Sequence, residues 1–389
     1  MIRRIFLIVL DSLGIGNAED AADFGDTGAN TLRSISGSPF FHIPFLTKLG
    51  FPTIDGVHLQ RSSHASLGAV GRLGELSKGK DTTIGHWEIC GIVSHTALPT
   101  YPRGFPNDII QPFCEMTGHG ILCNRPYSGT EVIRDFGRQH LETHKLIVYT
   151  SADSVFQIAA HESCVSLDKL YEYCRMARRI LVGTNSVGRV VARPFAGNPG
   201  HFYRTPHRHD FSLDPPRHTV LDLLKENSLD VIGIGKINDI FAGRGLTAYS
   251  YTSGNEEGMS RTSYYLEQNF HGLCFVNLVD FDMLYGHRNN TDGYAKALSE
   301  FDNWLARFCQ KMRPDDLLMI TADHGCDPGF LKSTDHSREQ VPLCIYGEKI
   351  IPYNLGTRKG FCDIAATIAD IFHLEHCLDG HSFWPLIAK

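Results

Sequence analysis

The chain has 389 residues, of which 42% are hydrophobic, 21% charged and 10% aromatic. This is an ordinary globular composition, and the length suggests two or three units with cores of their own rather than one. The formal net charge of −6 gives no indication of a nucleic-acid partner. An anionic substrate would therefore need a local cationic site, made by metals or by a few Arg and Lys side chains.

The apolar run at 5–10 is too short for the core of a signal peptide or for a membrane span, and it stops at Asp11. No later stretch of the sequence reaches spanning length. The eleven cysteines include no C-x-x-C pair, which is typical of reduced thiols rather than of a disulfide framework or a Cys-ligated zinc site. These features predict a soluble, cytoplasmic protein with no membrane partner.

In chain order, the first predicted element is a buried strand at 5–10, a continuous apolar run rich in β-branched residues. The middle of the chain lies between a Pro-rich break at 96–106 and a second break around Pro215 and Pro216. Between them are a strand candidate at 146–154 and a helix candidate at 168–180. We interpret residues 97–216 as an inserted α+β domain, with the two breaks as its hinges.

Beyond the second break, the pattern of a parallel sheet returns. A helix is predicted at 219–226, and apolar strands follow at 231–234, 273–279 and 317–320. In the segment 293–312 the apolar residues recur every three or four positions, as on one face of an amphipathic helix. Helices alternating with apolar strands form βαβ units. Residues 1–96 and 217–389 are therefore predicted to form an α/β core with a mostly parallel sheet flanked by helices.

Acidic and His side chains follow three of these strands where each one ends. They are Asp11, then Asp280, Asp282 and His287, then Asp323 and His324, with Asp335 and His336 shortly after. Because ligands gather at the carboxyl ends of the strands in open parallel sheets, we expect these loops to converge. Oxygen and nitrogen donors without a thiolate suit Mn²⁺, Zn²⁺ or Mg²⁺, and two such metals about 4 Å apart can clamp a phosphoryl group.

Each of these residues also has a simpler structural explanation. An Asp after a strand is usually a turn former or a helix cap, and a lone His in a loop more often packs or faces solvent than binds a metal. The structural explanation, however, needs several independent coincidences. The joint occurrence of Asp11, the Asp282 loop and the Asp323-His324 pair therefore favours a metal site.

A candidate nucleophile lies in the segment that begins at Gly79. Thr82 and Thr83 stand there beside Lys80 and Asp81. A Thr hydroxyl is a poor nucleophile at its ordinary pKa, but coordination to a metal can activate it. A structural Thr cap is the alternative, and the spacing alone favours that alternative.

Longer motifs surround these residues. They are DSLGIG, GKDTTIGHWE, YTSADSVFQIAAHE, VARPFAG, TPHRHDF, GKINDIF, LVDFDMLYGHR, TADHGCDP and TDHSRE. Together they resemble the motifs of bacterial phosphopentomutases along essentially the whole chain. The short Asp, Thr, Asp-x4-His, Asp-His and His elements are shared with the wider alkaline phosphatase superfamily, whereas GKDTTIGHWE and YTSADSV are narrower. The resemblance implies an alkaline phosphatase-like core and an isomerase that interconverts ribose 1-phosphate and ribose 5-phosphate, and their 2-deoxyribose equivalents.

The resemblance also implies two Mn²⁺ ions. One would be held by Asp282, His287 and His336, and the other by Asp11, Asp323, His324 and the side chain of Thr82. Thr82 aligns with the family's phosphorylated threonine, and Thr83 is the alternative if the register is off by one. The sequence departs from the commonest family pattern at Ile84 and Cys326, and neither position binds a metal in the family.

The inserted domain would be the cap that recognises the sugar phosphate. The contacts implied by the resemblance are Ser151, Asp153, Arg193 and Arg204 or Arg208, with Lys236 contributing from the core. An Asp can accept hydrogen bonds from ribose hydroxyls, and Arg suits a phosphate held away from the metals. A solvated surface Arg is the alternative explanation for each of these arginines.

The implied reaction passes through phospho-Thr82 and a pentose 1,5-bisphosphate, with glucose 1,6-bisphosphate or ribose 1,5-bisphosphate as the activator. The bisphosphate would turn in the site or leave and rebind before returning its other phosphate. A rival interpretation is a cofactor-independent phosphoglycerate mutase or a phosphomonoesterase of the same superfamily. Such an enzyme would share the metal set but lack GKDTTIGHWE and YTSADSV.

Overall fold

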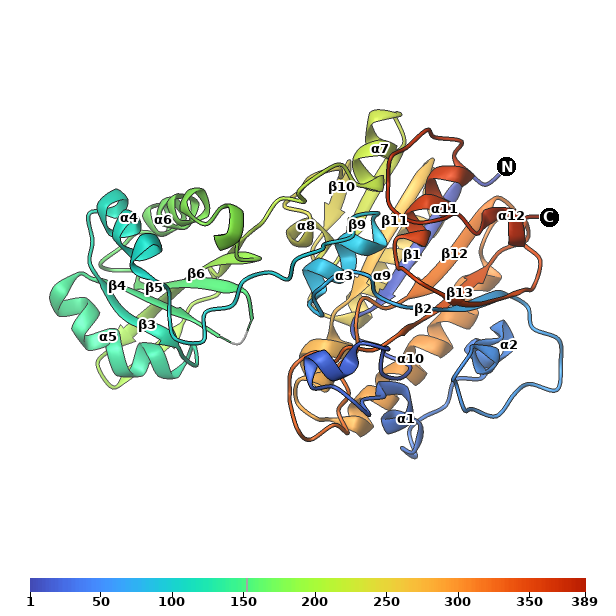
Figure 1. The fold of residues 1–389 in the computed structure, drawn as a ribbon, viewed down its shortest axis with the longest axis horizontal. Helices are drawn as coiled ribbons and strands as arrows, with labels where there is room; N and C mark the ends of the chain where they lie inside the picture. Colours follow the sequence, from blue (N-terminus) through green and yellow to red (C-terminus); the bar gives the residue numbers. More distant parts are fainter. Residues whose placement is uncertain (152) are drawn as a thin grey trace. The chain divides into compact units, whose positions relative to one another are not determined.

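The structure, a computed structural model, describes residues 1–151 and 153–389. The chain divides into two compact units (Figure 1). Unit 1 comprises Met1–Thr96 and Pro215–Lys389, and unit 2 comprises Ala97–Asp214. Unit 2 is thus one continuous segment inserted into unit 1. Ala152, which belongs to the segment 146–154 expected to contain a strand, lies outside the described residues.

Unit 1 is built on an eight-stranded sheet with the order β10-β9-β11-β1-β12-β13-β2-β14. Its strands are β1 (Arg4–Leu10), β2 (Ala69–Leu73), β9 (Asp230–Ile234), β10 (Ala248–Ser250), β11 (Gly272–Leu278), β12 (Asp316–Thr321), β13 (Val341–Tyr346) and β14 (Asn354–Arg358). The strands from β10 to β12 all pair in parallel, whereas β13 is antiparallel to both of its neighbours. The mostly parallel sheet confirms the predicted α/β class.

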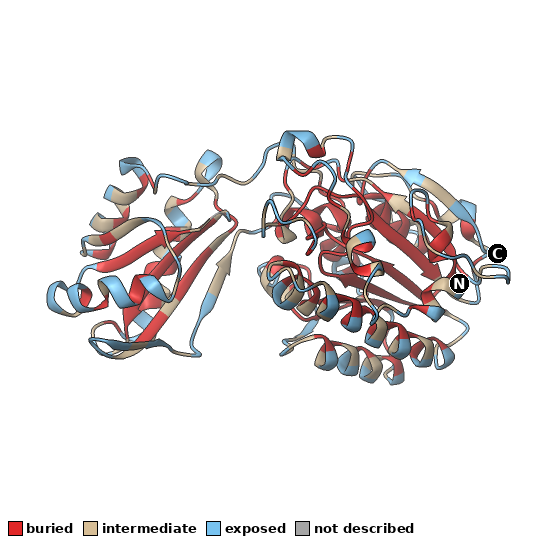
Figure 2. Cartoon of the chain, turned by 90° about the horizontal axis from the view of Figure 1, so that it is seen from below, coloured by how far each residue is buried: buried red, intermediate tan, exposed pale blue. Residues whose placement is uncertain are grey.

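The central strands are buried along their whole length. Every residue of β1, β11 and β12 is buried, and Figure 2 shows the sheet of this unit mostly as buried strands beside helices that are exposed only in part. A strand covered on both faces has no solvent side, so its sequence is a continuous apolar run rather than an alternating one. This is why the sequence located these strands to within a residue or two at most ends.

Helices cover both faces of this sheet (Figures 1 and 2). They are α1 (Thr31–Ser36), α2 (Pro44–Leu49), α3 (Thr82–Ile89), α7 (Val220–Glu226), α8 (Ile237–Ile240), α9 (Asn255–Glu267), α10 (Thr291–Gln310), α11 (Asp363–Ile371) and α12 (Trp384–Ile387). In one layer α10 contacts α1, α2 and α9, and in the other α11 contacts α3, α7 and α12. The apolar stripe of α10, which includes Leu298, Phe301 and Leu305, is buried, as its helical spacing predicted.

The register of the central strands fixes where the following loops meet. Leu10 at the end of β1 pairs with Leu278 of β11, and Val9 pairs with Thr321 of β12. Asp11 lies two residues beyond Val9, and Asp323 lies two residues beyond Thr321. Asp11 and Asp323 are therefore level with each other. The carboxyl ends of β1, β11 and β12 thus form one edge from which all three acidic loops start.

Unit 2 holds a six-stranded mixed sheet with three longer helices. The strands are β3 (Ile121–Pro126), β4 (Leu146–Thr150), β5 (Val155–His161), β6 (Arg189–Asn198), β7 (His201–Arg204) and β8 (His209–Ser212), in the order β3-β4-β5-β6-β7 with β8 on β6. The helices are α4 (Asn107–Thr117), α5 (Glu131–Thr143) and α6 (Leu167–Ile180). One core cluster joins α4 and α6 to the sheet and a second joins α5 to it, so helices cover both of its faces.

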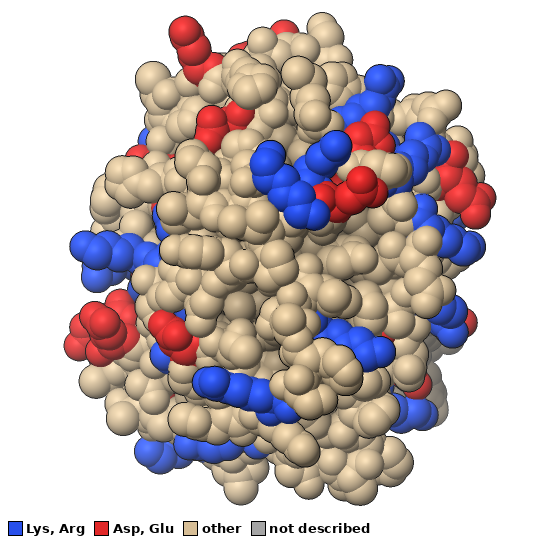
Figure 3. Space-filling view, turned by 90° about the vertical axis from the view of Figure 1, so that its right-hand side faces the viewer, with Lys and Arg blue, Asp and Glu red and all other residues tan. Residues whose placement is uncertain are grey.

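Within the described residues, no helix combines the length and the apolar character needed to cross a membrane. On the face drawn in Figure 3, basic and acidic side chains are scattered among uncharged ones rather than gathered by sign. This distribution is in keeping with the modest formal net charge of −6.

Candidate active site

Three buried carboxylates meet at the edge formed by β1, β11 and β12. Asp11 and Asp323 are fully buried, and Asp282 is 3% exposed. Two groups of side chains there have ligand atoms within 4.8 Å of one another, namely Asp282 with His287 and His336, and Asp11 with Asp282 and His324. Because Asp282 belongs to both groups, the two groups adjoin.

The first group is organised around the carboxylate of Asp282, on the π-helical turn Phe281–Gly286. His287 Nε2 lies 3.2 Å from Asp282 Oδ2, and His336 Nε2 lies 3.5 Å from Asp282 Oδ1. His287 Nδ1 donates to the carbonyl oxygen of Thr334 at 2.6 Å, which directs Nε2 toward the carboxylate. Burial acts to raise the pKa of Asp282, but the His336 and His287 imidazoles lower that pKa well below its ordinary value.

The second group brings the Asp323-His324 pair to Asp11. His324 Nε2 lies 3.5 Å from Asp11 Oδ1 and 3.3 Å from Asp323 Oδ2. Burial lowers the pKa of His324 to about 4, so this imidazole is neutral at neutral pH and its nitrogen is available as a ligand. The pKa of Asp323 falls to about 2 despite burial, because His324 and His86 lie beside it. Asp323 thus adjoins the second group, although it is outside the 4.8 Å set.

The donor set fits a pair of divalent cations. Asp11 Oδ1, Asp282 Oδ1 and Asp323 Oδ2 are buried and have no hydrogen-bond partner among the described residues. Burial and the neighbouring Asp323 raise the pKa of Asp11 well above its ordinary value. Buried carboxylate oxygens without partners are costly unless a cation compensates them. Carboxylate oxygens with imidazole nitrogens are the ligands of Mn²⁺, Zn²⁺ and Mg²⁺ rather than of thiophilic metals.

Thr82 is the first residue of α3 and faces the second group. Its Oγ1 lies 3.1 Å from His324 Nε2. Asp81 caps the helix, since its Oδ1 accepts hydrogen bonds from the backbone N–H groups of Thr83 and Ile84 at 3.1 Å each. The hydroxyl of Thr82 is therefore placed by a capped helix start. This contact between Thr82 Oγ1 and His324 Nε2 supports Thr82 rather than Thr83 as the candidate nucleophile.

Helix α3 packs against the Asp323 loop through Gly85. A Cβ added at Gly85 would lie 2.1 Å from the carbonyl oxygen of Asp323, a backbone atom that cannot move aside cheaply. We expect Gly85→Ala to destabilise the protein by about 1–3 kcal/mol and to lower kcat, because the helix must retreat from the site. Gly37→Ala is the matched control, since nothing lies within 4 Å of a Cβ there. Urea unfolding and steady-state kinetics of both variants measure these effects. Equal free energies of unfolding and equal kcat values for Gly85→Ala and Gly37→Ala would contradict the expectation.

The three predicted substrate arginines of unit 2 lie within β6 (Arg193), at the end of β7 (Arg204) and just before β8 (Arg208). The buried hydroxyl of Tyr149 has no hydrogen-bond partner among the described residues, and the charges of Arg193, Arg204 and Arg208 affect its pKa. Burial raises the pKa of Tyr149, and the three guanidinium groups oppose that rise. Arg208 is already paired with the Asp210 carboxylate, to which it donates at 2.6 and 2.8 Å, and Arg193 donates to Gln157 at 3.0 Å. Part of this positive charge is thus balanced within unit 2, and an anionic ligand would balance the rest.

The remaining predicted substrate residues have local partners. Ser151 Oγ accepts a hydrogen bond from the backbone N–H of Asp153 at 3.3 Å, and Asp153 Oδ2 lies 3.5 Å from Arg189. Lys236 belongs to unit 1, where its Nζ lies 3.8 Å from Asp11 Oδ2. The structure therefore brings Lys236 to the metal-ligand candidates. Ser151 and Asp153 belong to unit 2.

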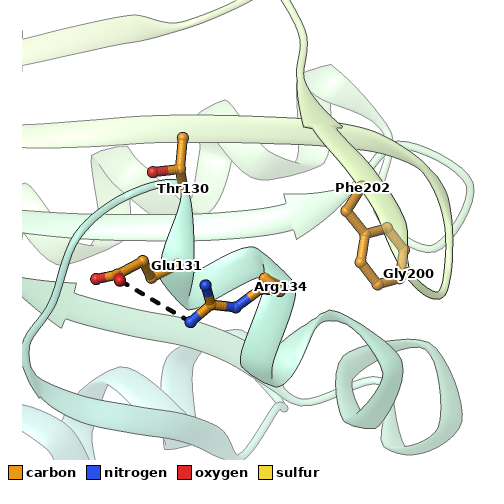
Figure 4. Close-up of a pocket in the computed structure, with 5 residues that line it drawn as sticks. All are labelled: Thr130, Glu131, Arg134, Gly200 and Phe202. Carbon is orange, nitrogen blue, oxygen red and sulfur yellow. Dashed lines mark ion pairs between the residues drawn. The ribbon is translucent and has the colours of Figure 1, made fainter.

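A cavity of unit 2, of about 290 Å³, is lined by Thr130, Glu131, Arg134, Gly200 and Phe202 (Figure 4). Its cation is already paired, since Arg134 lies 3.9 Å from Glu131 and hydrogen-bonds Asp135 at 2.8 Å. This cavity contains none of the predicted substrate residues. We therefore do not place the sugar phosphate there.

Comparison with known proteins assigns the family. A model of the metalloenzyme superfamily matches residues 3–376. A phosphopentomutase from Lachnoclostridium phytofermentans is 55% identical over 98% of both chains, and one from Carboxydothermus hydrogenoformans is 53% identical over the whole of both. The chain belongs to the phosphopentomutase family. A solved structure of an alkaline phosphatase superfamily protein from Vibrio parahaemolyticus aligns with 96% of this chain and 67% of its own, at 12% identity and a TM-score of 0.43.

Membership of the phosphopentomutase family confirms the resemblance seen in the motifs, and with it an isomerase of the metalloenzyme superfamily. Sequence reasoning passed over some residues that touch the site. His86 lies within GKDTTIGHWE but was given no role, and Asn277 is a lone amide in an otherwise apolar strand. A polar residue inside a buried apolar strand is the signal that would have found Asn277, because such a group needs a partner.

Proposed function

We propose that this member of the phosphopentomutase family moves phosphate between C1 and C5 of ribose and 2-deoxyribose, through phospho-Thr82 and with two Mn²⁺ ions. The observation that carries the proposal is the Thr82 hydroxyl, 3.1 Å from His324 Nε2 at the rim of two adjoining carboxylate and imidazole groups. Full-length identity of 55% to a phosphopentomutase supports the choice of substrate.

The proposed metal ligands form two sets, which follow the two groups of side chains described above. Asp282, His287 and His336 would hold one ion, and Asp11, Asp323, His324 and Thr82 Oγ1 would hold the other. Such a pair would neutralise charge on the transferring phosphoryl group and lower the pKa of the threonine hydroxyl. Oxygen and nitrogen donors alone do not distinguish Mn²⁺ from Zn²⁺ or Mg²⁺. Activity of the metal-stripped protein reconstituted with each metal in turn decides between them.

In the proposed cycle, phospho-Thr82 gives its phosphoryl group to the free hydroxyl of a bound pentose monophosphate. The bond from phosphorus to the Thr82 oxygen breaks as a bond to the sugar oxygen forms, and the proton of the sugar hydroxyl ends on the Thr82 oxygen. The products are a pentose 1,5-bisphosphate and free Thr82. The bisphosphate then gives Thr82 the phosphate that the substrate carried from the start, which restores phospho-Thr82. Before the first cycle, glucose 1,6-bisphosphate or ribose 1,5-bisphosphate would supply the phosphate on Thr82. Rigid placement of Thr82 by the capped helix α3 supplies the positioning on which such transfers depend.

We further propose that unit 2 recognises the sugar phosphate. Arg193 with Arg204 or Arg208 would bind the phosphate that is not being transferred, and the unpartnered hydroxyl of Tyr149 is a further donor for it. Ser151 and Asp153 would contact the sugar hydroxyls, and Lys236 would contribute from unit 1.

We expect Arg193→Ala to raise KM for ribose 5-phosphate about 10- to 100-fold, with a smaller effect on kcat, since a charge-assisted hydrogen bond contributes about 1.5–3 kcal/mol. Arg134→Ala is the control, because this arginine of unit 2 is exposed and pairs with Glu131 and Asp135. Steady-state kinetics of both variants show whether KM rises in Arg193→Ala and stays unchanged in Arg134→Ala. Equal KM values for the two variants would exclude Arg193 from the phosphate site.

A substrate panel tests the proposed function directly. With Mn²⁺ and a sugar bisphosphate present, we expect rapid conversion of ribose 1-phosphate and 2-deoxyribose 1-phosphate. We expect little turnover of 3-phosphoglycerate or p-nitrophenyl phosphate. Faster turnover of 3-phosphoglycerate would support a phosphoglycerate mutase, and faster hydrolysis of p-nitrophenyl phosphate would support a phosphomonoesterase.

A further inference from the structure

His86 lies on α3, one turn after Thr82, and is fully buried. Its Nδ1 donates a hydrogen bond to the carbonyl oxygen of Thr82 at 2.9 Å, and the same nitrogen lies 3.1 Å from Asp323 Oδ2. On its other side, Nε2 lies 3.4 Å from Nδ2 of Asn277. One imidazole therefore contacts the nucleophile's backbone, an acidic side chain of the second group and an amide of β11.

Asn277 extends this chain of contacts to the first strand. Its Nδ2 donates to Asp11 Oδ2 at 3.2 Å, and its second amide hydrogen is the one that faces His86. Asn277 is fully buried, so these contacts are shielded from water. The reverse amide orientation would turn its oxygen toward the Asp11 carboxylate, which is unfavourable. The contacts thus run from Thr82 through His86 to Asp323, and through Asn277 to Asp11.

These partners determine which nitrogen of His86 carries the proton. The atoms near Nδ1 are the Thr82 carbonyl and the Asp323 carboxylate, which are acceptors, whereas Nε2 faces an amide donor. The ring is therefore the tautomer with hydrogen on Nδ1 and a lone pair on Nε2. Each ring nitrogen then has its own contacts, and a substitution can remove the contacts of one nitrogen while retaining those of the other.

We propose that His86 is a positioning residue for phosphoryl transfer, which holds the Thr82 hydroxyl and the Asp11 and Asp323 carboxylates in one fixed arrangement. The inference rests on the proposed function, in which these groups meet around the metals. Because α3 begins at Thr82, any shift of the helix relative to Asp323 moves the nucleophile directly. A displacement of about 1 Å can cost about 100-fold in rate, so a buried tie at this point has a large effect on catalysis.

Two substitutions at His86 distinguish this role from simple packing. In His86→Asn the side-chain amide nitrogen occupies roughly the place of Nδ1, so the contacts to Thr82 and Asp323 can persist. In His86→Gln the amide reaches roughly the place of Nε2 instead, and those contacts are lost. We expect kcat to fall about 10- to 100-fold in His86→Gln, as is usual for residues that orient metal ligands, with KM little changed and with partial rescue in His86→Asn.

Two further readouts do not depend on turnover of the metal-loaded enzyme. Mn²⁺ affinity of the unphosphorylated protein, measured by calorimetry, is expected to fall in His86→Gln more than in His86→Asn. Phosphate incorporated at Thr82 from a sugar bisphosphate in a single-turnover experiment is expected to slow in the same order. Asn277→Ala interrupts the same chain of contacts from its other end, and we expect the same pair of effects with smaller size.

His140 supplies a matched control in unit 2. It is also fully buried and bonded at both nitrogens, with Nδ1 to the Lys145 carbonyl at 2.6 Å and Nε2 accepting from the His161 N–H at 3.0 Å. We expect His140→Asn to lower Tm and to leave kcat and Mn²⁺ affinity within about twofold, because its contacts are structural.

The outcomes separate this inference from the proposed function. If wild-type protein acquires phosphate at Thr82 and turns over ribose 1-phosphate, but both His86 variants change only Tm, as His140→Asn does, the positioning role is wrong. Equal losses of kcat in His86→Asn and His86→Gln would also overturn it, since the Nδ1 contacts would then not matter. If the wild type itself acquires no phosphate on Thr82, the proposed function fails instead.

Discussion

Thr82→Ala is expected to abolish both the phosphoenzyme and mutase activity, with a fall in kcat of at least about 10⁴-fold, as for other nucleophile knockouts. The hydroxyl of Thr82 lies 3.1 Å from His324 Nε2, at the start of a capped helix packed on the Asp323 loop. Water cannot replace the hydroxyl in this role, because the cycle needs a carrier that keeps the phosphate. The measurement combines a coupled mutase assay with phosphate stoichiometry after incubation with a sugar bisphosphate.

Thr83→Ala is the control for that experiment. Thr83 is 9% exposed, and its backbone N–H rather than its hydroxyl takes part in the helix cap. We expect this variant to keep phosphate stoichiometry near that of the wild type and kcat within about tenfold, with some loss of stability. If Thr83→Ala instead lost the phosphoenzyme while Thr82→Ala kept it, the two residues would exchange roles and the register of the motif would be off by one.

Asp282→Asn is expected to lower metal affinity and kcat by more than about 100-fold, since even indirect partners of metal ligands cost 10- to 100-fold. Asp282 is the residue common to both candidate metal groups, and its carboxylate lies within 3.5 Å of both His287 and His336. A ligand that binds only the folded state stabilises it by about 2.7 kcal/mol at one hundred times its Kd. Mn²⁺ should therefore raise the Tm of the wild type, and most of that rise should be absent in Asp282→Asn.

Asp280→Asn is the neighbouring control. Asp280 Oδ2 accepts a hydrogen bond from the backbone N–H of Asn255 at 2.7 Å, and an Asn side chain can still accept at that place. We expect its Mn²⁺-dependent rise in Tm to match that of the wild type. Equal loss of the rise in both variants would mean that the acidic loop as a whole, and not Asp282, determines metal binding.

Much of the core fold is readable from the sequence, and the reason is burial. Strands β1, β9, β11 and β12 are continuous apolar runs because helices cover both faces of the sheet, and the apolar period of α10 follows from one buried stripe. Strands such as β14, in which no residue is buried, and β6, which carries Arg193 among apolar residues, lack that simple pattern. β14 pairs with β2 from the other end of the chain, and β6 is recognised only through its pairing with β5, β7 and β8.

The same division holds within the candidate site. Asp11, Asp282 and Asp323 can be picked out in the sequence as candidate ligands, because each carboxylate follows a buried strand whose end position is set by the sheet. The contacts of His86 could not be predicted from the sequence, since they involve Asn277, which lies 191 residues away along the chain. Tyr149 resembles an ordinary core residue in the sequence, although its buried hydroxyl has no hydrogen-bond partner among the described residues and three arginines oppose the rise of its pKa. Contacts between distant polar groups are thus what sequence patterns leave out.

The most direct test of the whole account is intact-mass measurement and peptide mapping of the wild-type protein after incubation with Mn²⁺ and ribose 1,5-bisphosphate or glucose 1,6-bisphosphate. The account predicts the added mass of one phosphoryl group, located on Thr82, which disappears when the metal is removed before incubation. An active mutase that carries no phosphate, or that carries it on any residue other than Thr82, would contradict it.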